Sequence, residues 1–527
     1  MKYPSIFNDV IGPVMRGPSS SHTAASVRIG RMAAELLGEI PVRVHCEFDP
    51  AGSLATTYNG QGSDIGLAGG FMGYSLDDDR LPDALKNARD TGMLIEYRIV
   101  SFPNNHPNTY KMTLWDKNDG KLNVTAISTG GGMFTISEID GYKVTVYGDY
   151  FELFVFCENF DETKFLQIES FYKGRDFEWL NCSFNNEGCG MINVKSALPL
   201  TDSFISSLCS LCDVSHIRQA SPILPVKTRK ESKALFLTAL DIDIFAREHS
   251  MNQLWELAAA YEAERGGITP EEVFEMMKGI VYKIKDSLIT GLEGTKYDDR
   301  ILSCQIHKYH DAMRKGRLLP SGLINAVVGY TISMMEVKSS MGVIVAAPTA
   351  GSCAVLPGAV FGAAKELDKD LDDCTKAMLS AGLIGVLISH GATFAAEVGG
   401  CQAECGSASG MAAAGIVELA GGNYKEAMTA ASFALQNTLG LICDPVANRV
   451  EVPCMSKNVM AATNAISSAT MALAGMDPVI PLDEVISTMK SVGQMLPCEL
   501  RCTGYGGLSI TPTAKRIEAG LRAESPG

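Results

Sequence analysis

The sequence predicts a multidomain protein with an α+β N-terminal domain, a ferredoxin-like middle domain and an all-α C-terminal domain. At 527 residues the chain is long enough for about two to four domains. Strand-like and helical runs mix up to about residue 137. A strand–helix–strand–strand–helix–strand order follows up to about residue 225, and helical periodicity dominates the remainder.

The first domain is expected over residues 1–137. The runs PVRVHCEF, TYKMTLW and LNVTAIS are rich in strand-forming residues, whereas AASVRIGRMAAELLG and LPDALKNARDTG have helical periodicity. Turn residues separate these runs. This mixture is typical of an α+β domain.

The middle domain is expected over residues 138–225. It opens with the strand-like YKVTVYGDYFELFVFCE and the amphipathic FDETKFLQIESFYKG. The runs DFEWLNCSF, GCGMINVKS, TDSFISSLCSLC and SHIRQASPI then complete the ferredoxin-like order. The basic stretch VKTRKESK that follows is interpreted as a linker.

Residues 226–527 are expected to form the helical domain. Its longest uncharged stretch, residues 377–396, reaches the length of a membrane span. His390, three glycines and several hydroxyl side chains instead favour a buried pair of closely packed helices.

The composition limits the possible partners and the compartment. A net charge of −15 and a pI near 5.1 repel nucleic acid and anionic membranes, so neither is expected as a partner. The first residues, MKYPSIFNDVIGP, do not resemble a signal peptide. Fifteen cysteines in such a chain fit reduced thiols better than a disulfide framework, which favours the cytoplasm.

Three cysteines near the C-terminus are candidate metal ligands. Cys401, Cys443 and Cys454 are spaced 42 and 11 residues apart, in turns rich in glycine and proline. Such turns let backbone N–H groups approach sulfur closely. Three thiolates are one too few for a four-iron cluster, so one iron would stay open for substrate. The alternative is that these are ordinary buried cysteines that only pack.

Several polar turns are candidate ligand sites. The run Ser19, Ser20, Ser21, His22, Thr23 precedes a helical segment, where hydroxyls and free N–H groups favour anion binding over a plain N-cap. The turn Thr349, Ala350, Gly351, Ser352 opens another helix in the same way. The glycines Gly130, Gly131 and Gly132 form either a ligand-binding turn or only a loop.

Other residues leave their roles open. The segment TTYNGQGSD, with Gln61, is either a polar turn or part of a site, and His106 is either solvated or catalytic. Cys353 is a cluster ligand, a nucleophile or a packing residue, and packing or a supporting position behind the ligands is favoured. Glu397 and His390 flank Cys401 in the sequence, and they either orient ligands or are satisfied core residues.

Together these motifs resemble the iron-sulfur-dependent L-serine dehydratases (L-serine ammonia-lyases), with β and α parts fused in one chain. The resemblance covers nearly the whole sequence. It rests on GPSSSHTA, HPNT, TGGG, PTAGSCAVLPG, AEVGGCQAECGSASGMAAA, CDPVANRVEVPC and GGLSITPT. It implies that Cys401, Cys443 and Cys454 hold a 4Fe-4S cluster, and that L-serine is converted to pyruvate and ammonia by β-elimination without pyridoxal phosphate.

The resemblance also implies roles for the polar turns. Ser19 to Thr23 and Gly130 to Gly132 would receive a small amino-acid substrate, and Thr349 to Ser352 would complete the pocket. The middle segment resembles an ACT domain, although the usual glycine is missing from ENFDETKF. A homo-oligomer, at least a dimer, is expected.

Two positions depart from the family pattern. The family reads GHGTD, with the histidine proposed as catalytic base, whereas this chain reads GQGSD with Gln61. Glutamine cannot act as a base near neutral pH, so His22 or His106 is the expected alternative. Cys502 stands where a residue like glutamate is expected.

The departure at Gln61 keeps further functions open. A related cluster lyase acting on L-cysteine, L-threonine or another β-substituted acid would use the same iron with a different pocket. An amino-acid sensor that has lost its base is the non-catalytic alternative.

Overall fold

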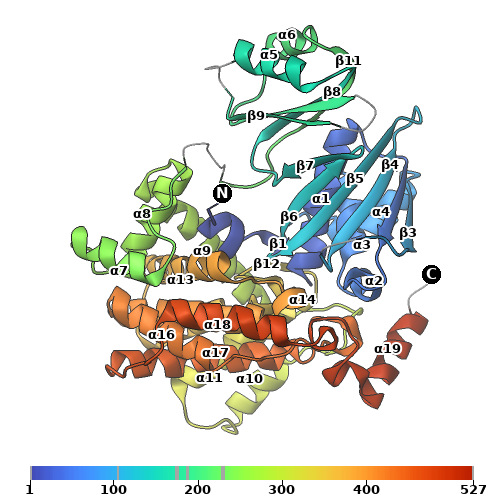
Figure 1. The fold of residues 1–527 in the computed structure, drawn as a ribbon. Coiled ribbons are helices and arrows are strands. Elements are labelled where there is room, and N and C mark those ends of the chain that lie inside the picture. Colours follow the sequence, from blue (N-terminus) through green and yellow to red (C-terminus); the bar gives the residue numbers. More distant parts are fainter. Residues whose placement is uncertain (1–2, 104–105, 173–176, 185–188, 227–231, 525–527) are drawn as a thin grey trace.

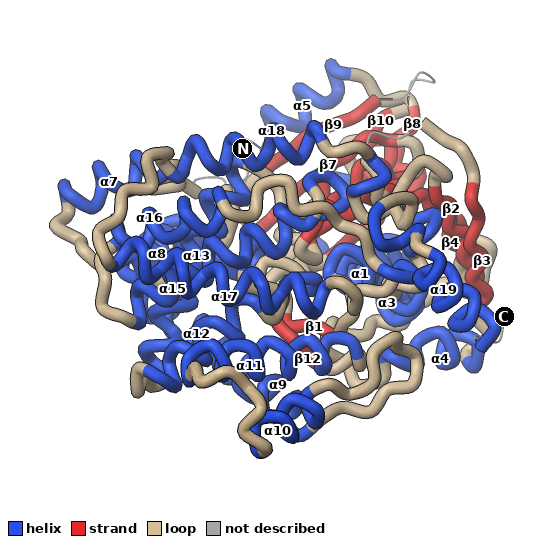
Figure 2. Tube along the Cα trace, turned by 90° about the horizontal axis from the view of Figure 1, so that it is seen from below, coloured by secondary structure: helices blue, strands red, loops and turns tan. Residues whose placement is uncertain are grey.

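The computed structural model describes residues 3–103, 106–172, 177–184, 189–226 and 232–524. Figure 1 shows a mixed α/β region and a small sheet domain beside and above a large helical body. This confirms a multidomain chain with a mixed N-terminal region and a helical C-terminal part. In Figure 2 the long helices of the body lie side by side, the strands of the two larger sheets are gathered at one end of the molecule, and β1 (Val14–Arg16) and β12 (Val343–Val345) lie among the helices.

The N-terminal region is built on a six-stranded sheet in the order β3-β2-β4-β5-β6-β7, in which only β2 and β3 pair in parallel. The strands are β2 (Arg43–Phe48), β3 (Leu94–Ile99), β4 (Thr109–Trp115), β5 (Lys121–Gly130), β6 (Met133–Ile139) and β7 (Tyr142–Val146). The helices are α1 (Ala25–Leu37), α2 (Leu54–Thr57), α3 (Ser63–Phe71) and α4 (Ala84–Asp90), with the short turns η2 (Ser20–Ala24) and η3 (Leu81–Asp83). One apolar core joins α1 and α3 to this sheet.

The small sheet has four antiparallel strands in the order β11-β8-β10-β9. Its elements are β8 (Phe151–Glu158), α5 (Glu162–Tyr172), β9 (Trp179–Phe184), β10 (Gly190–Ser196), α6 (Asp202–Cys209) and β11 (Asp213–Ala220). Their order along the chain is the expected strand–helix–strand–strand–helix–strand order.

The boundary between the N-terminal sheet and the small sheet lies between β7 and β8, after the predicted boundary at residues 137/138. The run YKVTVYGDYFELFVFCE was expected to be the first strand of the middle domain, but its first part is β7 of the N-terminal sheet. Gly148, with φ +76°, lies in the turn between β7 and β8. A left-handed backbone there interrupts the extended chain, so the two parts join different sheets. Most of the expected linker, residues 227–231, lies outside the described residues.

The helical body contains the remaining long helices. They are α7 (Ala239–Glu248), α8 (Leu254–Gly266), α9 (Pro270–Glu293), α10 (Ile306–Arg314), α11 (Gly322–Ser339), α12 (Val355–Glu366), α13 (Leu371–Gly391), α14 (Ala396–Gly399), α15 (Ser407–Leu419), α16 (Tyr424–Gln436), α17 (Cys454–Leu473), α18 (Leu482–Met495) and α19 (Pro512–Glu524). The short turns are η4 (Ala350–Ser352), η5 (Gln402–Gly406), η6 (Val446–Asn448), η7 (Cys498–Leu500) and η8 (Gly507–Ile510). The alanine-rich α15 packs against α12, α13, α16 and α17, because its small side chains permit close approach.

The uncharged stretch at residues 377–396 lies largely within α13, whose side chains are mostly buried among neighbouring helices. Within the described part of the chain, no helix combines the length and apolar character that a bilayer crossing needs.

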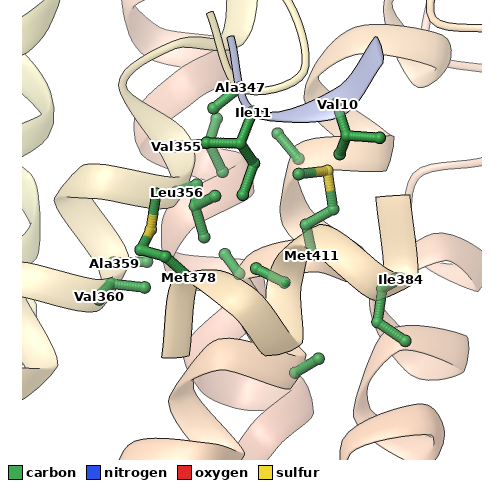
Figure 3. Packing of buried hydrophobic residues seen from close by; sticks show 14 of the residues in the cluster. Val10, Ile11, Ala347, Val355, Leu356, Ala359, Val360, Met378, Ile384 and Met411 are labelled. Atoms are coloured by element: carbon green, nitrogen blue, oxygen red, sulfur yellow. The ribbon is translucent and has the colours of Figure 1, made fainter. Parts of the chain in front are cut away.

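The N-terminal segment belongs to the helical body in space. The turn η1 (Ile6–Val10) packs against α13, and Figure 3 shows Val10 and Ile11 among side chains of α12, α13 and α15. Strand β1 (Val14–Arg16) then pairs with β12 (Val343–Val345), antiparallel. Residues 1–137 therefore do not form one separate unit, because the residues of η1 and β1 pack in the core of the helical body.

Close helix packing in the body depends on glycine. A Cβ added at Gly362 in α12 would lie 2.5 Å from Cγ2 and 2.9 Å from Cα of Val327 in α11. We expect Gly362→Ala to destabilise the protein by about 1–3 kcal/mol, since backbone atoms must move. The control Gly279→Ala, on an exposed position of α9 with open space, should stabilise by up to about 1 kcal/mol. Urea-unfolding midpoints followed by circular dichroism measure both, and equal shifts would contradict this account of the packing.

Candidate active site

The three candidate ligand cysteines lie buried at one end of the helical body. Cys401 immediately precedes η5 and α15, Cys454 is the first residue of α17, and Cys443 lies in the loop after α16. Cys401 is 3% exposed, Cys454 is 8% exposed and Cys443 is 6% exposed. Helix starts stabilise a thiolate through their free N–H groups and dipole, which applies to Cys401 and Cys454.

Gln402 holds the Cys401 turn against the Cys443 loop. Its backbone N–H donates to the carbonyl of Leu441 at 2.9 Å, and its side-chain Oε1 accepts from the N–H of Gly440 at 2.9 Å. Both contacts fix the loop just before Cys443 beside the residue just after Cys401.

Lys457 joins α17 to the same loop. Its Nζ donates to the carbonyl of Ile442 at 2.7 Å and to Oδ1 of Asp444 at 2.8 Å. These two acceptors flank Cys443 in the chain, whereas Lys457 lies one helical turn after Cys454. The lysine therefore ties the second ligand segment to the third.

Asn458 ties the third ligand segment to the opposite wall. Its Nδ2 donates to the carbonyls of Cys454 and Gly351, both at 2.8 Å, and lies 3.7 Å from Sγ of Cys405. The amide thus connects the start of α17 with the η4 turn and with η5. Three polar side chains consequently hold all three cysteine segments in one place.

The thiols and their lysine influence each other. Burial lowers the pKa of Lys457, but the negative charges of Cys401, Asp444 and Cys443 outweigh this effect and raise it. A hydrogen bond from Cys405 lowers the pKa of Cys401 despite its burial. The site therefore supplies a local positive charge that stabilises anionic sulfur.

Thiolates are the donors that an iron-sulfur cluster takes from a protein. Among the described residues, no three His, Cys, Asp or Glu side chains converge on one point as a mononuclear metal needs. A four-iron cluster takes one thiolate per iron, so its ligands stand apart around it. The three buried thiols lie on three separate, mutually tied segments, with the ammonium group of Lys457 beside them.

Gln61 and Cys502 meet at the edge of this group. Nε2 of Gln61 lies 3.7 Å from Sγ of Cys502 and donates toward it. Cys502, with φ 62°, also donates its N–H to the carbonyl of Cys443 at 2.9 Å. A hydrogen bond from Cys443 to the sulfur of Cys502, together with burial, raises the pKa of Cys443. Gln61 therefore reaches the cysteine loops as a hydrogen-bond donor.

The two predicted substrate turns meet across the domain boundary. The N–H of Ala350 donates to Oγ of Ser20 at 3.0 Å. Thr349 donates its hydroxyl to Oε1 of Glu404 at 2.7 Å and accepts from the N–H of Ser352 at 3.3 Å. The Ser19–Thr23 and Thr349–Ser352 segments thus form one continuous wall.

The glycine turn contacts the same boundary. Gly130, Gly131 and Gly132 have φ values of 99°, 61° and 84°, a left-handed region that other residues rarely adopt. A Cβ on Gly130 would lie 3.2 Å from Ala395, and one on Gly131 would lie 3.1 Å from the carbonyl of Pro348. Glycine here allows the turn to lie directly against the helical body.

His22 is fully buried in this wall, and its hydrogen bonds assign its protons. Thr57 donates its hydroxyl to the carbonyl of Ser53 at 2.7 Å, so it accepts from Nε2–H of His22 at 2.8 Å. Nδ1 is then the basic nitrogen, 3.2 Å from Oγ of Ser19 and 3.8 Å from Oε1 of Glu397. Burial lowers the pKa of His22 to about 3, which keeps the ring neutral.

Glu397 and Asn108 are incompletely hydrogen-bonded beside His22. Burial raises the pKa of Glu397, and the nearby Asn108 and Ser21 lower it only in part. Within the described chain, Oε2 of Glu397 and both polar atoms of the Asn108 side chain have no well-formed hydrogen bond. Unpaired buried polar groups of this kind indicate a position that a ligand fills.

The remaining predicted residues line or support this wall. Thr23 donates its hydroxyl to the carbonyl of Gln61 at 2.9 Å, and the carbonyl of Ser21 accepts from Oγ of Ser128 at 2.7 Å. The side chain of Cys353 is fully buried in the apolar core, as expected for packing. His390 is exposed at the end of α13, so neither of its expected roles fits.

His106 contacts its own loop. Its Nδ1 accepts from the N–H of Asn108 at 3.1 Å, and its carbonyl accepts from the hydroxyl of Thr109 at 2.8 Å. Burial lowers its pKa. His106 thereby fixes the position of Asn108, which faces Glu397.

A cavity of about 940 Å³ lies between the N-terminal region and the helical body. It is lined from one side by α2 and Gly60, and from the other by η6, Thr503 and α19. Gly60 and Thr503 are the chain neighbours of Gln61 and Cys502. The cavity is therefore the candidate entrance to the site.

Sequence reasoning missed four residues of this group: Asn108, Glu404, Lys457 and Asn458. Asn108 and Glu404 lie within the motifs HPNT and AECGS, so their position in those motifs was an available signal. Lys457 and Asn458 follow Cys454 by one helical turn, which places them on the same helix face.

Comparisons with known proteins agree with the joined architecture. The family described as "Serine dehydratase alpha chain" matches residues 248–509. The probable L-serine dehydratase, alpha chain, of Bacillus subtilis is 41% identical over 263 residues, covering 50% of this chain and 88% of the relative. The probable L-serine dehydratase, beta chain, of Bacillus subtilis is 44% identical over 150 residues, covering 28% of this chain and 66% of the relative. The L-serine dehydratase TdcG of Escherichia coli is 26% identical over 523 residues, covering 94% of this chain and 96% of the relative.

Glu404 makes stability depend on pH in the metal-free chain. Burial, Cys401 and Glu397 raise its pKa to about 8. Between about pH 4.5, the ordinary carboxyl pKa, and about pH 8, Glu404 is protonated in the folded chain and ionised in the unfolded chain. The folded chain therefore binds one proton more than the unfolded chain, and the free energy of unfolding falls as the pH rises. We expect Glu404→Gln to flatten the fall in unfolding midpoint between about pH 5 and 8. Glu275→Gln, at an exposed position of α9, is the control, and an unchanged slope in Glu404→Gln would contradict this assignment.

Proposed function

The chain belongs to the serine dehydratase family, and we propose that it is an L-serine ammonia-lyase that converts L-serine to pyruvate and ammonia by β-elimination. The observation that carries the proposal is the meeting of three buried thiols with a polar wall containing His22, Glu397 and Asn108. The first group suits a cluster, and the second lacks the partners that an amino acid provides.

We propose that Cys401, Cys443 and Cys454 hold a 4Fe-4S cluster with one iron free of protein ligands. Such an iron supplies a Lewis acid that stabilises the charge developing on the departing hydroxyl group. Lys457 supports the ligand set, because its ammonium group lies between two of the three segments. Cys405 supports it from the other side through its hydrogen bond to Cys401.

The substrate's ammonium group is assigned to Glu397 and Asn108. Asn108 and Ser21 already donate toward Glu397, but Oε2 of Glu397 and Oδ1 of Asn108 lack a well-formed hydrogen bond, which an ammonium group with its three donors would supply. Binding would also favour the ionised form of Glu397 against the effect of burial. The carboxylate would lie near Ser19–Thr23, Gly130–Gly132 and Thr349–Ser352, whose turns offer hydroxyl and N–H donors.

His22 is the proposed base that removes the Cα proton, a role that requires the ionised Glu397 beside Nδ1 to raise the low pKa that burial gives His22. Its Nδ1 is the unprotonated nitrogen and faces Ser19 and Glu397, while Thr57 holds Nε2–H in place. Gln61, which stands where the family has histidine, instead donates toward Cys502 and orients that loop. The departure at Gln61 is thereby compatible with catalysis.

The domain roles follow from the same proposal. The N-terminal domain contributes Ser19–Thr23 and Gly130–Gly132 to the substrate wall, and residues 226–527 contribute Thr349–Ser352, Glu397 and the cluster ligands. The middle domain is proposed to be ACT-like, since its strand order β11-β8-β10-β9 and its element order are those of that fold class. A homo-oligomer remains part of the proposal.

A product assay tests the reaction. The anaerobically purified chain is incubated with L-serine, L-threonine or L-cysteine, and pyruvate, 2-oxobutyrate, sulfide and ammonia are measured. We expect equal amounts of pyruvate and ammonia from L-serine, with the highest kcat/KM among the three. Serine consumption by an iron-free chain only after pyridoxal phosphate is added would overturn the proposal.

The cluster ligands are tested by comparing two buried cysteines. Cys443→Ala should abolish both iron retention and serine turnover, because the cluster loses one of three thiolates. Cys374→Ala, in α13, should leave both nearly intact, since Cys374 packs in the apolar core. Iron and sulfide analysis of both variants decides, and equal iron contents would refute the ligand assignment.

The base is tested by exchanging each histidine candidate. His22→Asn should lower kcat about 100-fold or more, which is the usual contribution of a general base, while iron content is unchanged. His106→Asn should have the smaller effect, because it acts only by holding Asn108. A larger loss in His106→Asn than in His22→Asn would transfer the role to His106.

A further inference from the structure

The middle domain carries cysteines that the proposed reaction does not use. Cys157 lies on β8, and Cys209 and Cys212 bracket the end of α6 in a Cys-Ser-Leu-Cys sequence. All three border the same small apolar core, together with Cys182 of β9. A Cys-x-x-Cys sequence with a third thiol nearby is a pattern that redox-active sites use.

Two of these thiols are already in contact. Sγ of Cys157 lies 2.9 Å from Sγ of Cys212 and donates a hydrogen bond to it. In the register of β8 and β11, Cys157 is paired with Val214, and Cys212 lies two residues before Val214, immediately ahead of β11. A disulfide requires a sulfur separation of about 2.0 Å, which the two side chains reach by a movement of less than about 1 Å.

The two thiols differ in exposure and in proton affinity. Cys157 is buried, whereas Cys212 is partly exposed and can meet a small molecule from solvent. The hydrogen bond from Cys157 lowers the pKa of Cys212, and Lys164 assists. The same hydrogen bond, with burial, raises the pKa of Cys157. Cys212 is therefore the thiol that attacks an external disulfide, and Cys157 is the thiol that resolves the resulting mixed disulfide.

We propose that Cys157 and Cys212 form a reversible redox site that small disulfides such as oxidised glutathione convert to an intramolecular disulfide. The Cys212 thiolate attacks one sulfur of oxidised glutathione, which breaks that disulfide and releases one glutathione thiolate. Cys157 then loses its proton and attacks Sγ of the mixed disulfide, which releases the second glutathione. The two cysteines lose two protons and two electrons, and oxidised glutathione becomes two glutathione molecules.

The position of the site gives the bond a structural consequence. Cys212 directly precedes β11, and Arg218 of β11 donates to Oδ2 of Asp140 at 2.8 Å and to the carbonyl of Leu36 at 3.0 Å. The bond therefore fastens the start of the strand that attaches the middle domain to the end of α1. Oxidation acts on the contact between the middle and N-terminal domains.

Peptide mapping of the full-length chain tests the proposal under anaerobic conditions, which protect any cluster. The protein is incubated with oxidised glutathione, and remaining thiols are alkylated before trypsin digestion. Cleavage at Lys164 and Lys195 separates Cys157 from Cys212. We expect one pair of peptides joined through these two residues, which an excess of reduced glutathione separates again. Cys182→Ser is the matched control from the same core and should give the same joined peptides.

Single variants test the order of attack. In Cys157→Ser we expect glutathione to remain trapped on Cys212, and in Cys212→Ser we expect Cys157 to stay unmodified. Cys209→Ser should still form the joined peptides. Trapping on Cys157 instead, a bond between Cys209 and Cys212, or no bond at all while circular dichroism shows a folded chain would overturn the proposal.

Discussion

The pairing of β1 with β12 sets the geometry on which the rest of the site depends. It anchors the chain just before the Ser19–Thr23 turn to the strand just before the Thr349–Ser352 turn. The two turns consequently approach from opposite domains, and the N–H of Ala350 reaches Oγ of Ser20. Because Val10 and Ile11 are buried among α12, α13 and α15, this pairing is fixed by the helical core.

A second constraint is electrostatic. The chain has a net charge of −15, yet the site buries thiols together with Glu397 and Glu404. Two lysines counter this charge locally. Lys457 lies between the cysteine segments. The fully buried Lys338 donates to the carbonyl of Val450, and its charge offsets part of the burial effect that raises the pKa of Cys454. An anionic group is thereby stabilised only inside the pocket, where the local field differs from that of the whole molecule.

Local sequence patterns predicted most helices and strands, but they did not predict contacts between segments that are distant in the sequence. TYKMTLW coincides with β4 because its alternation matches a half-buried strand. YKVTVYGDYFELFVF was read as one strand because period and composition do not reveal which sheet a strand joins, and Gly148 divides it. The edge strand β3 was missed, although Ile95, Tyr97 and Ile99 alternate with Glu96 and Arg98 as in a half-buried strand. The cysteines and polar turns were visible as motifs, but Lys457 and Asn458 gain their meaning only when α17 meets the Cys443 loop and η4.

The central claim is that one corner of a three-thiolate iron cluster is open toward the polar wall. Mössbauer spectroscopy of the anaerobically purified, 57Fe-enriched chain tests this most directly. The account predicts that L-serine changes the signal of one iron in four and leaves the other three as they were. Iron that is absent from active protein, or four irons that all ignore L-serine, would contradict it.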